Sequence, residues 1–399
     1  MSRFLFVVPP LMGHVNPARA VAATLAGRGH QVAWTGSEAT LRPLLGAEAT
    51  IYPTGSRIHR PQADLGLASV KSVWERFIVP FTRFTLPAVE KAVADYRPDV
   101  LVTDQTTPAG ALVAHRHGLP WATLICSTID LCRPYRGLPK VEAWMSDQLA
   151  GLWAAAGLPA AERFDVRYSP YLVLAFTSRE LTGPLLPPAD GAHVRLVGPA
   201  FGERAGDPDF PWDWLDPARR HVLVTMGTLA DDLAADFNAR AVAAFAPLAA
   251  QLQAIVLGAP DADAGAAENV LMLPKAPVLR LLPKLDAVVT HGGLNTVCES
   301  LASGVPLVVA PIRHDQPVNA GLVTAAGAGV RIRFARARPA EVGAAVRTVL
   351  EDVRYAEAAG RIARSFAAAG GATGAAGHLE ELAGRTHMVD RQLSPSSHA

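Results

Sequence analysis

The sequence predicts an α/β protein with two Rossmann-like halves, because two separate segments each open with an apolar strand that runs into a turn. The first segment has strands at Phe4 to Val8 and Gln31 to Thr35, with a helix from Pro17 to Arg28 between them. The second segment begins with the apolar strand His221 to Thr225. A chain of 399 residues has room for two or three domains.

A change of composition between residues 198 and 220 separates the two halves. This stretch reads GPAFGERAGDPDFPWDWLDPARR, and its Gly, Pro and Asp content favours a linker. The predicted organisation is an N-terminal domain at 1–204, a linker at 205–220, a C-terminal domain at 221–376 and a C-terminal segment at 377–399 whose tail should be disordered.

Composition and charge exclude several classes of protein. The formal net charge is +1 and no charge block occurs, which argues against nucleic acid as a partner. Three cysteines without paired-ligand spacing favour a reducing compartment. The N-terminal apolar run is too short for a signal-peptide core, and Pro247 and Gly258 interrupt the most membrane-like stretch, Ala241 to Pro260. We therefore expect a cytoplasmic protein without a membrane span, as a monomer or a homodimer.

Two polar residues stand at the carboxyl ends of predicted strands in the first half. The loop Pro9 to Asn16 presents His14, and the strand from Val100 ends on Asp104. Ligands of open α/β sheets bind at that edge, so both side chains should face one crevice. The chain contains no G-x-G-x-x-G pattern, which disfavours dinucleotide binding.

Aromatic residues recur at spacings of three and four between Ser56 and Ala88, which predicts a helix with a kink at Pro80. Packing in the core is the first interpretation of this pattern. The wall of an apolar ligand pocket is the alternative. The residues concerned are Trp74, Phe77, Phe81 and Phe84.

The stretch from Leu285 to Asn319 holds the densest group of polar residues. A buried strand, Asp286 to Thr290, runs into the turn HGGLNT, and a helix follows from Leu294 to Ala302. The N–H groups at a helix start carry about half a positive charge, so the turn predicts an anion site, with phosphate as the expected anion.

A sequence pattern in this stretch resembles the donor-binding motif of a known family. The pattern H-G-G-x-x-[ST]-x-x-E is followed, after the next strand, by Asp315-Gln316, and the opening GHVNP at 13–17 also fits. On these motifs the chain resembles bacterial natural-product glycosyltransferases of the antibiotic or macrolide type, in the inverting UDP-glycosyltransferase superfamily. The resemblance covers nearly the whole chain and implies the GT-B fold, in which two Rossmann-like domains face each other across a cleft.

The resemblance also implies roles for the matched positions. His14 would be the general base and Asp104 its partner, and the final helices would pack back onto the first domain. The aromatic residues at 74, 77, 81 and 84 would line the acceptor pocket. The donor diphosphate would be held by Thr228, His291, Gly293, Asn295 and Thr296, the ribose by Glu299, and the sugar by Asp315 and Gln316.

One segment departs from the family pattern. Members usually carry W-x-P-Q before the donor helix, with the tryptophan stacked on the nucleobase, whereas this chain has Lys275 in the tryptophan's place. A lysine stem covers a ring face without π-stacking, and the backbone of Ala276 remains available to the base edge. The donor is therefore left open between a UDP-sugar and a dTDP-sugar.

The expected activity is inverting, metal-independent transfer of that sugar to a nucleophilic group, above all a hydroxyl, of a lipophilic small molecule. No cofactor or metal is expected, because the D-x-D triplets at 207–209 and 261–263 lie in loops of Gly, Pro and Ala. Two alternatives stay open. One is a nucleotide-sugar epimerase of the same fold, and the other is a donor-binding homologue without catalysis.

Overall fold

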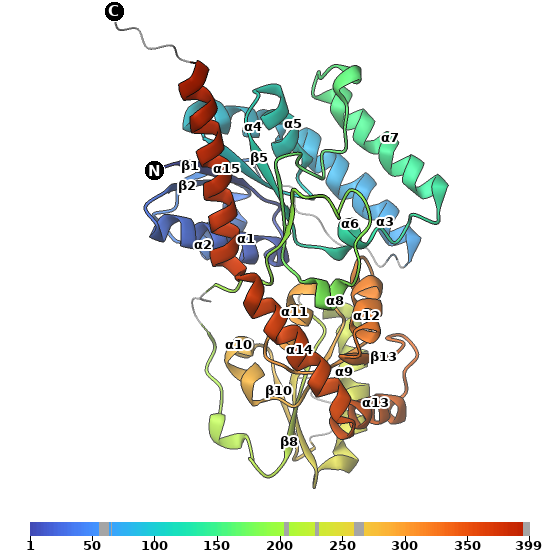
Figure 1. Ribbon diagram of the computed structural model, residues 1–399. Coiled ribbons are helices and arrows are strands. Elements are labelled where there is room, and N and C mark those ends of the chain that lie inside the picture. The colour runs from blue at the N-terminus through green and yellow to red at the C-terminus, as the bar shows by residue number, and fades with distance from the viewer. Residues whose placement is uncertain (56–63, 65, 203–206, 228–230, 259–266, 394–399) are drawn as a thin grey trace, which may run out of the picture. The chain divides into compact units, whose positions relative to one another are not determined.

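The chain divides into two compact units in the computed structural model, which describes residues 1–55, 64, 66–202, 207–227, 231–258 and 267–393, except for the side chains of 231–233 and 386–393 (Figure 1). Unit 1 comprises Met1–Thr177, Pro184–Glu203 and Ala369–Ala399. Unit 2 comprises Ser178–Gly183 and Arg204–Ala368. Each unit contains one parallel sheet with helices packed against it.

The sheet of unit 1 has seven parallel strands in the order β3-β2-β1-β4-β5-β6-β7. The chain order reverses between β1 and β4, and this is the point where open α/β sheets form their ligand crevice. The strands are β1 (Arg3–Val7), β2 (Gln31–Gly36), β3 (Ile51–Pro53), β4 (Val100–Asp104), β5 (Trp121–Ile125), β6 (Leu172–Ala175) and β7 (Val194–Leu196).

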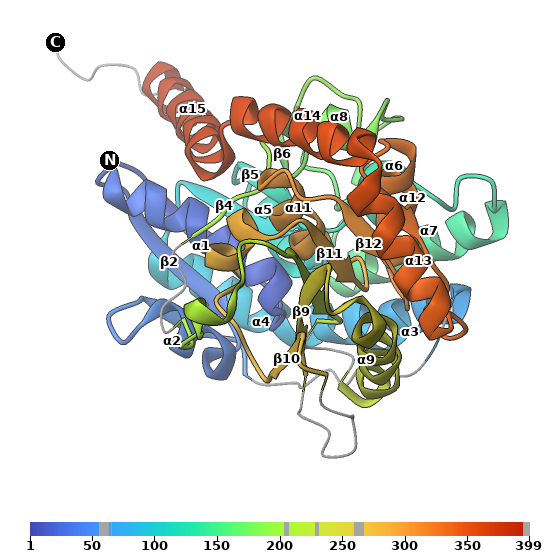
Figure 2. The ribbon, with the colours of Figure 1, turned by 90° about the horizontal axis from the view of Figure 1, so that it is seen from below.

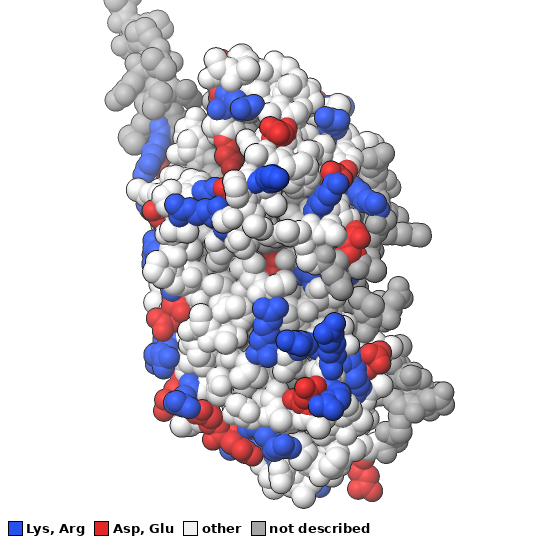
Figure 3. Space-filling view, turned by 90° about the vertical axis from the view of Figure 1, so that its right-hand side faces the viewer, with Lys and Arg blue, Asp and Glu red and all other residues white. Residues whose placement is uncertain are grey.

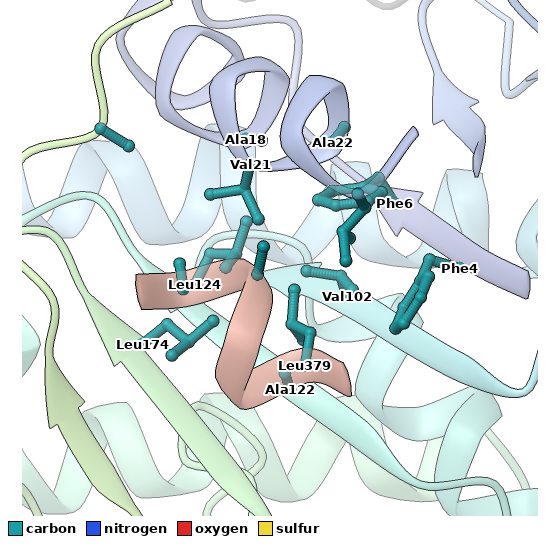
Figure 4. Packing of buried hydrophobic residues seen from close by; sticks show 14 of the residues in the cluster. Phe4, Phe6, Ala18, Val21, Ala22, Val102, Ala122, Leu124, Leu174 and Leu379 are labelled. Carbon is teal, nitrogen blue, oxygen red and sulfur yellow. The ribbon is translucent and has the colours of Figure 1, made fainter. Parts of the chain in front are cut away.

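Helices cover both faces of this sheet, because alternate strand residues enter two separate hydrophobic clusters. Phe4 and Phe6 belong to one cluster, and Leu5 and Val7 belong to the other (Figure 4). The helices are α1 (Met12–Gly27), α2 (Glu38–Leu45), α3 (Leu67–Val73), a π-helical turn (Trp74–Ile78), α4 (Val79–Tyr96), α5 (Pro108–Arg116), α6 (Thr128–Cys132), α7 (Pro139–Ala155) and α15 (Gly371–Leu393).

Helix α15 occupies most of the C-terminal segment that begins at 377. The chain is helical to Leu393, and Leu379 and Leu382 enter the hydrophobic cluster that also contains α1. Glu380 pairs with Arg28 and His30 of the first domain segment at 2.7 and 3.0 Å. The packing of the last helix onto unit 1 is thereby confirmed, and residues 394–399 lie outside the described part of the chain.

The sheet of unit 2 has six parallel strands in the order β10-β9-β8-β11-β12-β13, with its reversal between β8 and β11. Its two faces are also covered. Figure 2 shows α9 and α13 together on one side of these strands, where they share a cluster with Val222 and Val224. The strands are β8 (Arg220–Thr225), β9 (Leu252–Leu257), β10 (Val270–Leu273), β11 (Ala287–Thr290), β12 (Leu307–Val309) and β13 (Gly329–Arg331).

The second layer of unit 2 packs on the opposite face, where Leu223 and Val288 contribute to another cluster. Part of the predicted linker joins this layer, since Phe210 is buried there. The helices of the unit are α8 (Arg179–Thr182), α9 (Asp231–Phe245), α10 (Val278–Leu281), α11 (Leu294–Ala302), α12 (Gln316–Ala325), α13 (Pro339–Glu351) and α14 (Val353–Ala369).

The distribution of surface charge and the character of the helices both agree with what the sequence predicts. Acidic and basic side chains are interspersed on the face shown in Figure 3, as the small net charge suggests. Within the described residues, every helix falls short of the combination of length and apolar character that crossing a membrane requires.

Candidate active site

A histidine and an aspartate from neighbouring strand ends form a buried pair in unit 1. Helix α1 begins earlier than expected, at Met12, so His14 lies in its first turn. The Nδ1–H of His14 donates to Oδ2 of Asp104 at 2.8 Å, and the two side chains are 15% and 0% exposed. The order β1-β4 places these two strand ends side by side, as the sequence predicted.

The aspartate of this pair is held in its ionised form. Burial alone raises the pKa of Asp104, but the charge and hydrogen bond of His14, together with two hydrogen bonds from Thr106, outweigh burial and lower it. The Thr106 backbone N–H and hydroxyl both donate to Oδ1, at 2.8 and 2.6 Å. An ionised acceptor at Nδ1 fixes the tautomer in which Nε2 of His14 is the basic nitrogen.

Cys126 is a third member of this group that sequence reasoning missed. It follows β5, the next strand of the sheet, and it is 6% exposed. Its thiol points to the backbone oxygen of His14 at 3.9 Å. Burial, and then the interaction with Asp104, raise the pKa of this thiol well above its usual value, so it stays protonated beside the carboxylate.

The same three residues are a group of potential metal ligands within the described part of the chain. Their ligand atoms lie within 4.8 Å of one another. The sequence spacing does not show this group, because His14, Asp104 and Cys126 follow three separate strands that only the sheet brings together.

A polar network continues from the Asp104 loop to a pocket in unit 1. Gln105 accepts a hydrogen bond from the backbone of Ser127 at 3.1 Å and donates to Asp130. Arg167 donates to Asp130 at 2.8 Å and to Asp165 at 2.7 Å. Burial raises the pKa of Asp130, whereas these two acids keep the pKa of Arg167 above its usual value despite burial.

The pocket lies between α6, α7 and the segment 163–167 and has a volume of about 500 Å³. This volume lies in the range of sites for small organic ligands. Its charged lining residues include the ion pairs Arg167–Asp130 and Arg133–Glu142, so these charges compensate one another. The apolar part of its wall is formed by Ile129, Tyr135, Met145, Leu149 and Phe164.

The four aromatic residues considered as an acceptor wall are divided between the core and the surface. Trp74, Phe77 and Phe81 are buried in a hydrophobic cluster of unit 1, as the core interpretation predicts, while Phe84 is 42% exposed. None of the four lines the pocket described above. Trp74 stands behind it, with the Arg167 guanidinium 5.7 Å from its ring centroid.

The expected donor turn of unit 2 is built around the imidazole of His291. A Cβ atom at Gly227 or Gly293 would come within 2.6 or 2.7 Å of this ring, so both positions require glycine. Gly292 has φ +88°, which also favours glycine. Burial lowers the pKa of His291 to about 4, a backbone hydrogen bond at Thr225 opposes that shift, and the charge of Arg313 adds to it.

Helix α11 starts directly after this turn, with Gly293 at its N-cap. Asn295 and Thr296 are therefore in its first turn, where backbone N–H groups have no carbonyl partner within the helix. Glu299 lies further along the helix and is only 6% exposed. The structure thus brings His291, the two glycines and the helix start together as the motif predicted.

The loop after β12 is bonded to that turn. The amide of Asn319 donates to the backbone oxygen of Gly292 at 2.8 Å and to Asp315 at 3.2 Å. Gln316 accepts from the backbone N–H groups of Ile312 and Arg313 at 2.8 and 2.9 Å. Asp315 and Gln316 therefore stand beside the turn, and the Gln316 oxygen holds the loop in shape.

Two further predicted donor residues are not in this group. Lys275 and Ala276 follow β10, the edge strand, and β9 and β8 separate that strand from β11. Lys275 is exposed. Thr228 falls outside the described residues, as does the triplet 261–263.

Comparison with known proteins agrees with this fold. Residues 212–366 match the family model of UDP-glucoronosyl and UDP-glucosyl transferase. The chain is 29% identical to 4'-demethylrebeccamycin synthase of Lentzea aerocolonigenes, over 92% of this chain and 96% of that protein. It is 27% identical to demethyllactenocin mycarosyltransferase of Streptomyces fradiae, over 96% and 87% of the two chains.

The solved structures show the same architecture. The crystal structure of the glycotransferase of kitacinnamycin superimposes with a TM-score of 0.75 at 28% identity, covering 96% of this chain and 99% of the other. The two parallel sheets, each with helices on both faces, are therefore those of a GT-B glycosyltransferase. Within that class the chain is a glycosyltransferase that uses a nucleotide-sugar, and it is similar to natural-product glycosyltransferases of bacteria and to the UDP-glycosyltransferases.

Proposed function

We propose that this protein is an inverting glycosyltransferase that moves a sugar from a UDP- or dTDP-sugar to a hydroxyl group of a lipophilic small molecule, with His14 as general base. The observation that supports it most directly is the 2.8 Å bond between His14 and the buried, ionised Asp104. The names of the two relatives, a demethylrebeccamycin synthase and a demethyllactenocin mycarosyltransferase, support a small-molecule acceptor.

The proton transfer follows from the chemistry of the acceptor. A hydroxyl group is a poor nucleophile until a base removes its proton during attack. In the proposed step Nε2 of His14 takes that proton while the acceptor oxygen bonds to the anomeric carbon. The bond from that carbon to the phosphate oxygen breaks, and the nucleoside diphosphate leaves with both electrons. Asp104 stabilises the imidazolium ion that forms.

Inversion follows if the acceptor attacks the face opposite the leaving group. A retaining route through a covalent intermediate needs a carboxylate that is free to attack. Asp104 does not meet this requirement, because its two oxygens accept hydrogen bonds from His14 and Thr106. Determining the anomeric configuration of the product by NMR tests this part, and a product that keeps the donor's configuration contradicts it.

The pocket of unit 1 supports a neutral acceptor. The more buried of its ion pairs, Arg167–Asp130, is already formed, so a charged acceptor would have to compete with that pair where little solvent reaches. The apolar wall and the volume of about 500 Å³ suit a small lipophilic molecule. Gln105 joins the pocket to the strand that ends on Asp104, so the proposed acceptor site adjoins the proposed base.

A pair of adjacent residues on α7 tests this assignment. Ser146 lines the pocket, whereas the neighbouring Asp147 does not, and both are exposed. Ser146→Trp should raise KM for the acceptor about tenfold or more, since the indole fills the space, while KM for the donor stays unchanged. Asp147→Trp is the matched control. Equal acceptor kinetics in both variants would place the acceptor elsewhere.

Activity itself is tested by release of nucleoside diphosphate from UDP- and dTDP-sugars. Release that requires an acceptor identifies a transferase, whereas release or isomerisation without one favours an epimerase. Binding of the donor with neither reaction would identify a non-catalytic homologue. Aliphatic alcohols are the better acceptors for this assay, because acidic phenols need less help from a base.

The transfer should proceed in full without a divalent metal. In the proposed site the phosphates meet the helix start of α11 and the His291 turn, which supply N–H donors instead of a cation from solution. Excess EDTA should therefore leave the rate unchanged. A rate that EDTA abolishes and Mn²⁺ or Mg²⁺ restores would contradict this part of the proposal.

A further inference from the structure

The donor turn is short of positive charge for the leaving group that the proposed function assigns to it. A departing nucleoside diphosphate gains negative charge as its bond to the sugar breaks, and fixed positive groups stabilise that charge most effectively. His291 does not supply a full charge, since burial lowers its pKa to about 4 and it is neutral near pH 7. The helix start contributes only about half of one.

An arginine lies in the loop beside this turn. Arg313 follows β12, the strand that pairs with β11 in the register Val309 to Thr290. His291 therefore follows one strand and Arg313 follows its neighbour, at the same edge of the sheet. Only 5% of Arg313 is exposed. Its positive charge is one of the causes that lower the pKa of His291.

The backbone around Arg313 is fixed in a specific conformation. Its N–H donates to Gln316 at 2.9 Å, and the next residue, His314, has φ +56°. A non-glycine residue in the left-handed region is costly and persists where the surroundings impose it, often at a functional site. Asn319 ties the same loop to Gly292 of the donor turn at 2.8 Å.

We propose that Arg313 binds the diphosphate of the donor and stabilises the charge that develops on the leaving nucleoside diphosphate. This inference rests on the proposed function and adds a group to it. The guanidinium stays protonated throughout, and its planar set of N–H donors matches two phosphate oxygens. When the bond between the anomeric carbon and the phosphate oxygen breaks, the electron pair stays on that oxygen, beside a permanent positive charge. Arg313 then takes the part that a divalent cation has in metal-dependent transferases.

Calorimetric titration with uridine, UMP and UDP, and with thymidine, dTMP and dTDP, separates this role from a structural one. Arg313→Gln should lower the affinity for the nucleoside diphosphate about 10–100-fold, because a charge-assisted contact is lost, and leave the affinity for the nucleoside unchanged. The diphosphate affinity of Arg313→Lys should lie between those of the wild type and the glutamine variant, because lysine keeps the positive charge but lacks the paired N–H donors of the guanidinium. The turnover number should fall further than KM for the donor rises, because the leaving-group charge is largest in the transition state.

Arg331→Gln is the matched control. Arg331 ends β13, the strand next to β12, and it is exposed. Its substitution removes one positive charge from the same sheet edge, so it should leave all six affinities unchanged. An equal effect of both substitutions would reduce the role of Arg313 to net charge and overturn the inference.

Other outcomes are equally clear. A uniform loss of affinity for nucleoside and diphosphate in Arg313→Gln would make Arg313 a structural residue, and an unchanged diphosphate affinity would remove it from the site. If the glutamine variant does not fold, Arg313→Met, which retains the apolar bulk, answers the same question. If the wild type transfers sugar and the Arg313 variants bind the diphosphate normally, only the inference about Arg313 is refuted. If the wild type binds no nucleotide at all, the proposed function is refuted as well.

Discussion

The two units each place a histidine in the segment that follows a strand at the reversal point of a parallel sheet, and the two histidines have opposite surroundings. His14 of unit 1 bonds to a buried carboxylate that stays ionised. His291 of unit 2 sits between two glycines, in a setting where burial lowers its pKa to about 4. The first arrangement favours accepting a proton and the second prevents it. The same residue type at the reversal points of two similar sheets is thus suited to proton transfer in one and to neutral hydrogen bonding in the other.

Removing each histidine should therefore produce different defects, and the largest is expected in unit 1. His14→Ala should lower the turnover number by about 10²–10⁴-fold, the usual contribution of a general base. The donor affinity should be nearly unchanged, because the donor is assigned to unit 2. Steady-state kinetics and calorimetry on the same preparation measure both quantities. A variant that keeps more than half of the wild-type rate with an aliphatic alcohol would rule out general-base catalysis by His14.

The neutral histidine should appear in the pH dependence of stability. An unfolded histidine titrates near 6.5, so between pH 6.5 and 4 the unfolded chain binds a proton that folded His291 does not take up. Stability should thus decrease as the pH falls through that window, by about 3 kcal/mol at its lower end. Denaturant unfolding at several pH values measures this loss. In His291→Asn this loss of stability should be smaller by most of the ~3 kcal/mol assigned to His291. A pH profile of stability identical to that of the wild type would show that His291 titrates normally in the folded protein.

Asp315 sharpens the comparison within the donor unit. Asp315→Asn keeps an oxygen that can accept the 3.2 Å hydrogen bond from Asn319 and removes the charge offered to the sugar. We expect about a tenfold loss of turnover with the nucleotide-sugar, from one charge-assisted hydrogen bond, and little change in affinity for the free diphosphate. Parallel losses of sugar turnover and of diphosphate affinity would assign Asp315 to the shape of the loop.

The smallest effect is expected at Cys126. Its thiol lies within 4.8 Å of the carboxylate that holds His14 and interacts with it electrostatically. Removing the S–H group in Cys126→Ala should therefore strengthen the hold of Asp104 on a protonated imidazole. The acidic limb of the pH–rate profile should then move to higher pH, with a rate change of only about two- to fivefold near neutral pH, as for a weak hydrogen bond. Cys126→Ser keeps a donor and should restore the profile. Coincident profiles for all three proteins would make the cysteine a packing residue only.

The sequence was sufficient where function depends on the order of strand, turn and helix. His14, Asp104 and the HGG turn could be placed because each follows an apolar strand, and parallel strands bring their carboxyl ends to one edge. Cys126 and Arg313 also follow strands, but a buried thiol and a lone arginine carry no pattern of their own. Their roles depend on side-chain contacts across neighbouring strands, which periodicity does not encode.

Helix α15 was expected from the family resemblance and not from its own sequence pattern. Its buried face is made largely of alanines with Leu379 and Leu382, and small residues give a weak helical pattern. The helix is specified by the surface it covers, which includes Phe4 and Leu124 from strands far away in the sequence (Figure 4). Such a segment is stabilised by tertiary packing more than by its own helix propensity.

That last helix has a consequence for how the protein is made and how it can be recombined. Unit 1 begins at Met1, yet its core is completed only by residues after Ala369, so the ribosome must finish almost the whole chain before the first unit can close. A truncated protein that ends after the last strand of the unit 1 sheet would expose the apolar surface that Leu379 covers. Chimaeras that exchange a donor unit between relatives therefore need two junctions, one on each side of the exchanged segment, so that the C-terminal helix stays with the N-terminal sheet that it fits.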